Sequence, residues 1–319
     1  MSKINSSIQM VKAFAPATCA NVAVGFDILG FAFAALGDFV TLTKRDDSQI
    51  IIESIHSKET LPFVAHKNTA SLVVQKFCQH VNLDIGFSIH IQKGIPLCSG
   101  MGGSAASAVA ALVACNHFLT SPLSNNELAH LALFGEQEAS GEAHADNIVP
   151  CLFGGFTLIQ SHTPMDIVTL PVPDLYCVLL HPHLQIATRD ARAALKKEIT
   201  LADYVRQSAN LASFIASLYE KDYQLMQKSM QDLIIEPQRA KFIPEFYSIK
   251  EAALQAGALG MSLSGSGPAL FAFARRIEEA EAIASVMGAI LKKKNIDFDC
   301  WISPISKQAA HVVHEERKL

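Results

Sequence analysis

The feature that most constrains this chain is a glycine-rich stretch at residues 94–104. Before it, Phe87, Ile89 and Ile91 put three apolar side chains on one face of a strand. After it, residues 105–119 are small and apolar on nearly every side, which is typical of a helix buried in a core. Glycines let backbone N–H groups converge on an anion, and a helix that begins there adds its dipole. The stretch therefore predicts a strand, a loop that holds a phosphorylated ligand, and a buried helix.

Other interpretations of the same loop are weaker. Residues 100–105 match the G-x-G-x-x-A fingerprint of dinucleotide-binding folds, which needs its first glycine directly after a strand. Here a segment containing Pro96 separates Ile91 from Gly100, and the acidic residue about 20 positions further on is Glu127, within a helix cap. A P-loop is excluded because no G-x-x-x-x-G-K-[ST] occurs. A tight turn that only packs the helix, with no ligand, stays open.

The two helices after the loop predict a metal site. Ser124 and Glu127 form an S-x-x-E capping box that begins a second helix after a turn at residues 120–123. At about 1.5 Å per residue both helices span about 20 Å, so Glu136 returns to the level of Ser104. A hydroxyl and a carboxylate beside a phosphate-binding helix end suit Mg²⁺. The hairpin therefore predicts that the ligand is a nucleotide with magnesium. The alternative is that Glu136 is an ordinary surface residue of its helix.

The composition excludes several classes of protein. Half of the 319 residues are hydrophobic, 18% are charged, and the formal net charge is −4. Such a chain predicts about two domains with buried cores. Its mildly acidic balance lacks the basic surface that nucleic acids require, so no nucleic-acid partner is expected. The apolar part of its longest uncharged stretch is shorter than the about 20 residues of a membrane span, so no membrane is expected.

The cysteines and histidines indicate the compartment and disfavour a zinc enzyme. Seven cysteines are widely spaced and include no C-x-x-C pair. With no secretory signal at the N-terminus, they predict reduced thiols and a cytoplasmic location. There is no HExxH motif, and His311 and His314 lie in a charged tail that we expect on a solvated face. We therefore expect no metalloenzyme of the zinc type.

Prolines near the middle of the chain, at positions 164, 171 and 173, predict a domain boundary. We expect one domain at residues 1–168 and a second at residues 169–319. Periodicity in the second half predicts alternating strands and helices, which favours an α+β sandwich. The expected elements are strands at 175–180, 269–274 and 298–302 and helices at 202–219 and 277–292.

Three motifs together resemble a family of small-molecule kinases. The segments are residues 15–27 (APATCANVAVGFD), 96–105 (PLCSGMGGSA) and 264–268 (SGSGP). They resemble the superfamily of galactokinase, homoserine kinase, mevalonate kinase and phosphomevalonate kinase. The first motif is similar to the homoserine kinase family in particular, as are Gly135-Glu136 with residues 144–147, Thr188 with Ala191-Arg192, and residues 236–239.

This resemblance implies a fold and an activity. The implied fold is a two-domain α+β small-molecule kinase, with an N-terminal domain like domain 2 of ribosomal protein S5, a ferredoxin-like C-terminal domain, and the site between them. The implied reaction transfers the γ-phosphate of ATP to the side-chain hydroxyl of L-homoserine, giving O-phospho-L-homoserine for threonine biosynthesis, in a possible homodimer. The alternatives are another alcohol kinase of the superfamily, such as a mevalonate-type enzyme, and a catalytically silent relative that binds nucleotide or metabolite.

The resemblance also implies which residues bind the nucleotide. The glycine loop would wrap the triphosphate, Ser104 and Glu136 would hold Mg²⁺, and Asn68 would lie on the base side. A second glycine turn would border the site. The expected ATP-binding residues are Asn68, Pro96, Leu97, Cys98, Ser99, Gly100, Met101, Gly102, Gly103, Ser104, Gly265, Ser266 and Gly267.

The implied substrate residues suit an amino acid with a hydroxyl arm. A zwitterion needs an acceptor for its ammonium and a cationic fork for its carboxylate. The resemblance implies Asp27 for the ammonium, Arg192 and Arg239 for the carboxylate, and Asn21 and Asn147 for the remaining polar atoms. Mevalonate has a carboxylate but no ammonium to pair with Asp27, so these residues favour homoserine.

The catalytic residues implied by the resemblance are Ser104, Glu136 and Asp146. An aspartate in a comparable D-N segment is the base in mevalonate kinase, so Asp146 is a hypothesis for the base here. Phosphoryl transfer also proceeds without a strong base, because positioning and charge neutralisation supply most of the catalysis. The chain departs from the usual pattern at Gly103, where serine is common, and at Cys19, which also replaces a serine. Neither change removes a charge.

Overall fold

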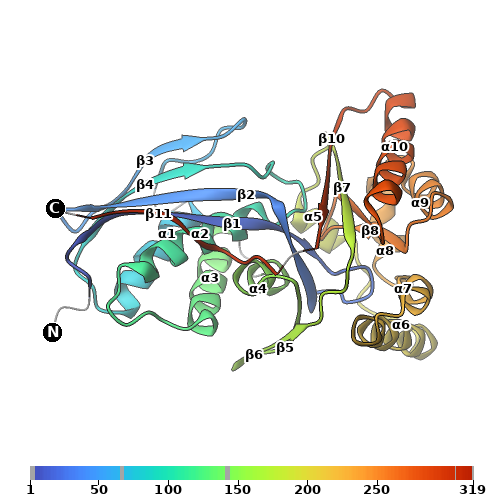
Figure 1. The fold of residues 1–319 in the computed structure, drawn as a ribbon, viewed down its shortest axis with the longest axis horizontal. Coiled ribbons are helices and arrows are strands. Elements are labelled where there is room, and N and C mark those ends of the chain that lie inside the picture. Colours follow the sequence, from blue (N-terminus) through green and yellow to red (C-terminus); the bar gives the residue numbers. More distant parts are fainter. Residues whose placement is uncertain (1–3, 65–67, 141–143, 306, 318–319) are drawn as a thin grey trace.

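The chain forms two sheets covered by helices, seen in a computed structural model that describes residues 4–64, 68–140, 144–305 and 307–317 (Figure 1). The larger sheet has the strand order β11-β1-β2-β4-β3, and β5 continues it from β2 to β6. Its strands are β1 (Ile8–Ala20), β2 (Leu29–Arg45), β3 (Ile50–His56), β4 (Gly86–Gln92), β5 (Phe156–His162), β6 (Met165–Leu170) and β11 (His311–Arg317). Its helices are α1 (Thr69–His80), α2 (Gly103–His117), α3 (Asn125–Ser140) and α4 (Ala145–Phe153).

The smaller sheet is antiparallel, with the order β10-β7-β9-β8. Its strands are β7 (Tyr176–Pro182), β8 (Gly260–Leu263), β9 (Leu270–Ala274) and β10 (Phe298–Pro304). The helices of this part are α5 (Thr188–Ala193), α6 (Leu201–Glu220), α7 (Tyr223–Ser229), α8 (Glu236–Arg239), a 3₁₀ turn (Ala240–Phe242), α9 (Phe246–Gln255) and α10 (Ile277–Lys293). The elements expected in the second half are confirmed to within a few residues.

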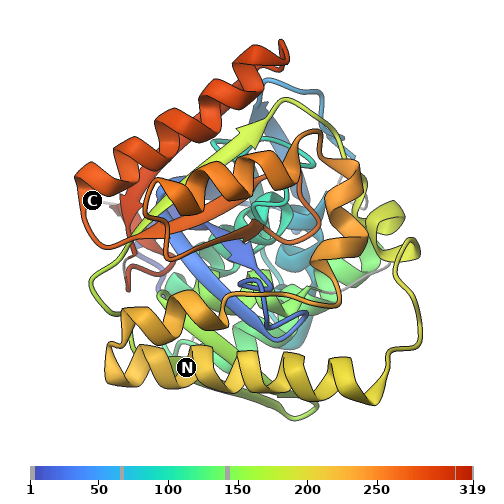
Figure 2. The same ribbon diagram turned by 90° about the vertical axis from the view of Figure 1, so that its right-hand side faces the viewer.

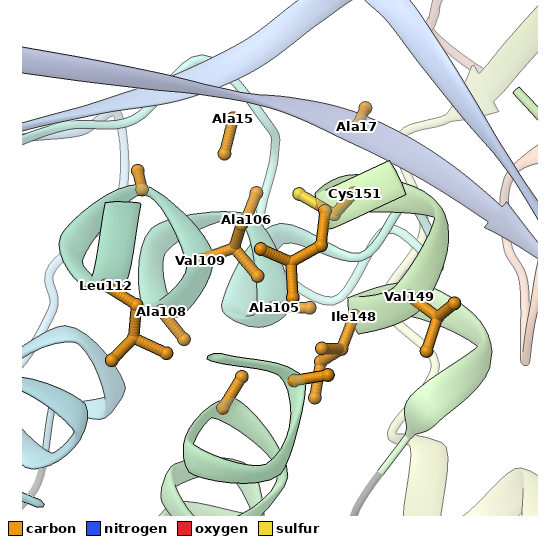
Figure 3. Packing of buried hydrophobic residues seen from close by; sticks show 14 of the residues in the cluster. Ala15, Ala17, Ala105, Ala106, Ala108, Val109, Leu112, Ile148, Val149 and Cys151 are labelled. Atoms are coloured by element: carbon orange, nitrogen blue, oxygen red, sulfur yellow. The ribbon is translucent and has the colours of Figure 1, made fainter. Parts of the chain in front are cut away.

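Helix α2 is buried because its residues are small. Ala105, Ala108 and Leu112 have no more than 2% of their surface exposed. Figure 3 shows α2 beside α4, with side chains of α4 such as Ile148 directed at it and Ala15 of β1 above. Small side chains let these backbones approach closely, which confirms the buried helix predicted after the glycine loop.

The hairpin of α2 and α3 is set by the expected cap. The backbone N–H of Ser124 donates to Glu127 Oε2 at 2.8 Å, and the N–H of Glu127 donates to Ser124 Oγ at 3.3 Å. This reciprocal pair is a capping box, and it begins α3 where the sequence predicts a helix.

The two parts share one hydrophobic core. Phe31 of β2 contacts Phe271 and Phe273 of β9, with ring centroids 5.6 and 5.3 Å apart. Phe214 of α6 contacts Phe156 of β5 at 6.1 Å, so α6 and α7 pack toward the larger sheet. Helices α9 and α10 cover the opposite face of the smaller sheet, and Figure 2 shows them well apart from α6 and α7. The parts are therefore joined by packing as well as by the chain.

Two strands lie near the predicted limits of the domains. The predicted boundary between residues 168 and 169 lies inside β6. At the other end, β11 pairs antiparallel with β1, from Ile8 opposite Arg317 to Phe14 opposite His311. The charged tail is thus a strand, in which His314 is exposed and His311 is half-buried. No helix in the described ranges is both long and apolar enough to cross a membrane.

Candidate active site

The glycine loop adopts a backbone that side chains would obstruct. Gly100 and Gly102 have φ angles of 79° and 67°, in the left-handed region that favours glycine. A Cβ on Gly102 would lie 2.1 Å from Thr18 Oγ1, and one on Gly100 would lie 2.5 Å from the carbonyl oxygen of Ser264. Gly102 is the N-cap of α2 and offers no side-chain acceptor, so the first N–H groups of α2 face the loop. This is the backbone arrangement that holds a phosphate.

Two further motifs meet this loop. Ser264 Oγ donates to the carbonyl oxygen of Gly100 at 2.7 Å, and the N–H of Gly265 donates to that of Ala20 at 3.2 Å. The three motifs quoted from the sequence are therefore in contact. Among the expected ATP-binding residues of the loop, the exposed ones are Cys98 and Ser104, the buried ones are Ser99 and Met101, and the half-buried ones are Pro96, Leu97, Gly100, Gly102 and Gly103.

The hydroxyl of Ser104 donates to Glu136 Oε1, as the similar lengths of the two helices predict. Glu136 is only 5% exposed, so it is not an ordinary surface residue. Thr69 Oγ1 lies 2.9 Å from Ser104 Oγ, and His144 Nδ1 lies 3.9 Å from Glu136 Oε2. The Glu136 carboxylate raises the pKa of His144 above its ordinary value. Sequence reasoning missed Thr69 and His144, although each stands next to or within a segment that it quoted.

Asp27 and Arg192 pair with each other across the site. Arg192 Nη1 and Nη2 donate to the two carboxylate oxygens of Asp27 at 2.9 and 2.8 Å. The ring of Phe26 lies below both predicted arginines, with its centroid 5.4 Å from Arg192 Cζ and 5.1 Å from Arg239 Cζ. Contact of a guanidinium with an aromatic face is attractive, so Phe26 aligns the two cations. Sequence reasoning quoted Phe26 within residues 15–27 but assigned it no role, because an aromatic side chain beside a glycine is usually a core residue.

Arg239 and Asn21 are anchored on the second glycine turn. Arg239 Nη1 and Asn21 Nδ2 both donate to the carbonyl oxygen of Gly265, at 2.9 and 3.1 Å. Asn21 Oδ1 accepts the N–H of Asp27 at 3.1 Å, which fixes the turn that carries Asp27. Arg239 is only 3% exposed, and burial together with the charge of Arg192 lowers its pKa from the ordinary value. Asn21 and Arg239 therefore share one peptide group, and Asn21 links it to Asp27.

Asp146 and Asn147 begin α4 beside this group. Asp146 is 3% exposed, and burial, followed by the charge of Asp27, raises its pKa to about 6. Asn147 Oδ1 accepts the hydroxyl of Thr18 at 2.8 Å and lies next to Gly102. Asn147 thus contacts the glycine loop, and Asp146 lies within electrostatic reach of the substrate residues.

The side chain of Asn68 caps the N-terminus of α1. Its Oδ1 accepts the N–H of Ala70 at 3.1 Å and caps α1, and its Nδ2 donates to the carbonyl oxygen of Pro62 at 3.3 Å. Its neighbour Thr69 reaches Ser104, so Asn68 lies at the edge of the loop. Other predicted polar residues contact one another or the quoted motifs, as Ser104 does with Glu136 and Arg239 with Gly265. The Asn68 side chain instead caps its own helix.

Lys93 lies under the loop and is fully engaged there. Its ammonium donates to Asp38, to the carbonyl oxygen of Gly103 at 2.6 Å and to Ser107 Oγ at 2.9 Å. An ammonium has three protons, so none remains for a phosphate. Lys93 therefore anchors the start of α2 and is no counterpart of a P-loop lysine. Asp38 is far away in sequence, which is why the pair was not expected.

Comparisons with known proteins match nearly the whole of this chain. The family model described as GHMP kinases N terminal domain matches residues 68–155, and that described as GHMP kinases C terminal matches residues 214–293. A homoserine kinase of Chloroherpeton thalassium is 44% identical over 319 residues, which cover 96% of this chain and 100% of that protein. The crystal structure of a homoserine kinase from Cytophaga hutchinsonii has a TM-score of 0.93 at 42% identity and covers 98% of this chain and 99% of its own.

A more distant structure shares the fold alone. The crystal structure of L. major mevalonate kinase in complex with R-mevalonate has a TM-score of 0.73 at 17% identity, over 97% of this chain and 100% of its own. The two-domain α+β fold expected from the sequence is thereby confirmed. The sequence identities of 44% and 42% to these homoserine kinases, over nearly the whole chain, and the matches to the two family models show that this chain belongs to the homoserine kinases, within the GHMP kinase superfamily.

Proposed function

We propose that this chain transfers the γ-phosphate of Mg-ATP to the side-chain hydroxyl of L-homoserine. The observation that carries the acceptor is the Asp27–Arg192 pair beside Arg239, at distances of 2.8 and 2.9 Å. An α-amino acid carries both an ammonium and a carboxylate, and it can replace this internal pair by two intermolecular ones. Because the side chains of Arg192 and Asp27 are 35% and 38% exposed, opening the pair costs little.

The residues beside the glycine loop fit a magnesium ion. The carboxylate of Glu136 is buried, and its nearest donor is the hydroxyl of Ser104, so two hard oxygen atoms converge at the start of α2. Ser104 and Glu136 would hold the ion, and the glycine loop would hold the phosphates through its N–H groups. When bound there, Mg²⁺ neutralises charge on the transferred phosphoryl group. Thr69 and His144 keep Ser104 and Glu136 in place.

The remaining residues orient the acceptor. Asp27 would accept the ammonium, and Arg192 with Arg239 would grip the carboxylate, which leaves the hydroxyl arm free to reach the γ-phosphate. The hydroxyl oxygen forms the new bond to phosphorus while the bond to the ADP oxygen breaks. The hydroxyl proton passes to a carboxylate oxygen of Asp146, whose pKa of about 6 leaves it mostly ionised at neutral pH.

Two alternatives stay testable. A mevalonate-type acceptor has no ammonium that could take the place of Arg192 beside Asp27, so the presence of a carboxylate among the arginines argues against it. A silent relative would bind Mg-ATP without turnover, and the joint presence of Ser104, Glu136 and Asp146 argues against that.

ADP release tests the proposal. Purified protein is given Mg-ATP with L-homoserine, mevalonate, galactose, L-threonine or no acceptor. We expect release that requires both homoserine and Mg²⁺. We expect Asp27→Asn to raise the KM for homoserine by about 10- to 100-fold, the worth of a charge-assisted hydrogen bond, whereas the exposed Asp190→Asn on α5 leaves it unchanged. Release with mevalonate alone would overturn the acceptor, and ATP binding without release would favour the silent relative.

A homodimer, implied by the resemblance, and a cytoplasmic location, expected from the cysteines, stay predictions. Light scattering of the purified chain and fractionation of the source cells would test them. We also propose that the working boundary between the domains follows β6, with β11 returning to the first domain.

A further inference from the structure

A second cluster of metal-ligating side chains lies on the smaller sheet, where β7 and β10 run side by side (Figure 1). Its members are His181, His183 and Asp299, and one ligand atom of each lies within 4.8 Å of the others. His181 stands directly opposite Asp299 in the strand register. Residues opposite each other share a face of a sheet. His183 follows the last residue of β7 and reaches the same side, because its Nε2 lies 3.0 Å from Asp299 Oδ2.

His181 is the residue that requires an explanation. It is only 6% exposed, yet neither of its ring nitrogens has a hydrogen-bond partner among the described residues. A buried polar atom without a partner is costly, and such an atom in a native protein often marks a bound ion or water. Leu179, on the same face of β7, packs in the core shared with the larger sheet, so this face lies between the two parts. The unpartnered nitrogens therefore mark a site between the parts.

The other two side chains are positioned to close on an ion. His183 Nε2 lies 3.0 Å from Asp299 Oδ2, and their side chains are 47% and 38% exposed, so both can rotate. Ligand atoms around an ion at about 2.0–2.1 Å lie about 3.3–4.2 Å apart, which small rotations reach from the observed spacing. The N–H of His183 donates to the carbonyl oxygen of Asp297 at 2.8 Å, so the backbone of the site is fixed.

We propose that His181, His183 and Asp299 form a binding site for a divalent transition-metal ion such as Zn²⁺. Two imidazoles with one carboxylate suit Zn²⁺ and its neighbours, whereas Mg²⁺ prefers oxygen ligands alone. Three protein ligands leave the fourth position of a tetrahedral ion for water.

Cobalt binding tests this site directly, because Co²⁺ replaces Zn²⁺ and absorbs visible light when coordinated. The full chain, freed of any polyhistidine tag and stripped of metal, is titrated with Co²⁺ and then with Zn²⁺. We expect one Co²⁺ per chain, displaced by Zn²⁺, and a thermal midpoint raised by a few degrees at saturating Zn²⁺.

Variants at the two exposed ligands assign the site. We expect His183→Ala and Asp299→Asn to abolish both the cobalt absorption and the thermal shift, while homoserine-dependent ADP release stays unchanged and shows that they fold. His162→Ala, at an exposed histidine that ends β5, serves as the matched control and keeps both signals. Absence of cobalt binding by the unaltered chain, or the same binding in His183→Ala, would overturn the proposal.

Discussion

At the scale of single residues, the burial of the Asp146 carboxyl lowers the free energy of unfolding at neutral pH. Burial raises the pKa of this carboxyl to about 6, above that of an unfolded aspartate. A raised pKa means that the folded state disfavours the ionised form, so Asp146 costs stability above pH 6 and the cost vanishes as the pH falls toward 4. A rise of about two pKa units corresponds to about 3 kcal/mol.

Asp146→Asn is therefore expected to have opposite effects on stability and turnover. At pH 8 we expect the free energy of unfolding to rise by up to about 3 kcal/mol, and at pH 4 to change little, as measured by urea unfolding. If Asp146 accepts the hydroxyl proton, kcat falls by about 10²- to 10⁴-fold while the KM for homoserine stays near its original value. The exposed Asp174→Asn should change neither. Near-normal turnover in Asp146→Asn would remove Asp146 from the role of base.

At the scale of elements, the start of α2 depends on one buried ion pair. Asp38 is fully buried and also accepts the N–H groups of Gly94 and Ile95, at 3.0 and 3.1 Å. Lys93→Met leaves this carboxylate without its cation, so we expect a loss of about 3–5 kcal/mol in the free energy of unfolding. The exposed Lys58→Met is the control. The double variant Asp38→Asn with Lys93→Met should be more stable than Lys93→Met alone, because it leaves no unpaired buried charge. An equal loss of stability in the single and the double variant would contradict the charge argument.

What could be predicted at this scale depended on local pattern. Ser104 and Glu136 were predicted because helix length and a capping box fix their relative height within one hairpin. Contacts between distant segments could not be read in the same way, because no local period relates Asp38 to Lys93. The histidines of the proposed transition-metal site were missed for a related reason. Their H-x-H spacing suits a strand, and the third ligand, Asp299, comes from a neighbouring strand.

At the scale of the whole molecule, the shared aromatic core makes the two parts depend on each other. Phe273 contacts Phe31 at 5.3 Å and Phe156 at 5.8 Å, both in the larger sheet. We expect Phe273→Ala to lower the free energy of unfolding by about 3–5 kcal/mol, while the exposed Phe63→Ala changes it little. In the unaltered chain the fluorescence of Trp301, on β10, should change at the same urea concentration as the circular dichroism. An earlier change at Trp301 would indicate that the smaller sheet unfolds alone.

The pairing of β11 with β1 has a consequence for the order of folding. Met10 of β1 pairs with Thr43 of β2 on one side and with Glu316 on the other, so the second edge of β1 is covered only after a segment far along the chain has docked. Until then β1 presents an open edge with unpaired backbone groups, which is a surface for wrong pairing with other chains. Contacts so distant along the chain also slow folding. Docking of β11 therefore covers the edge of β1 late in folding, and we expect intermediates that lack this pairing to be the forms most exposed to aggregation.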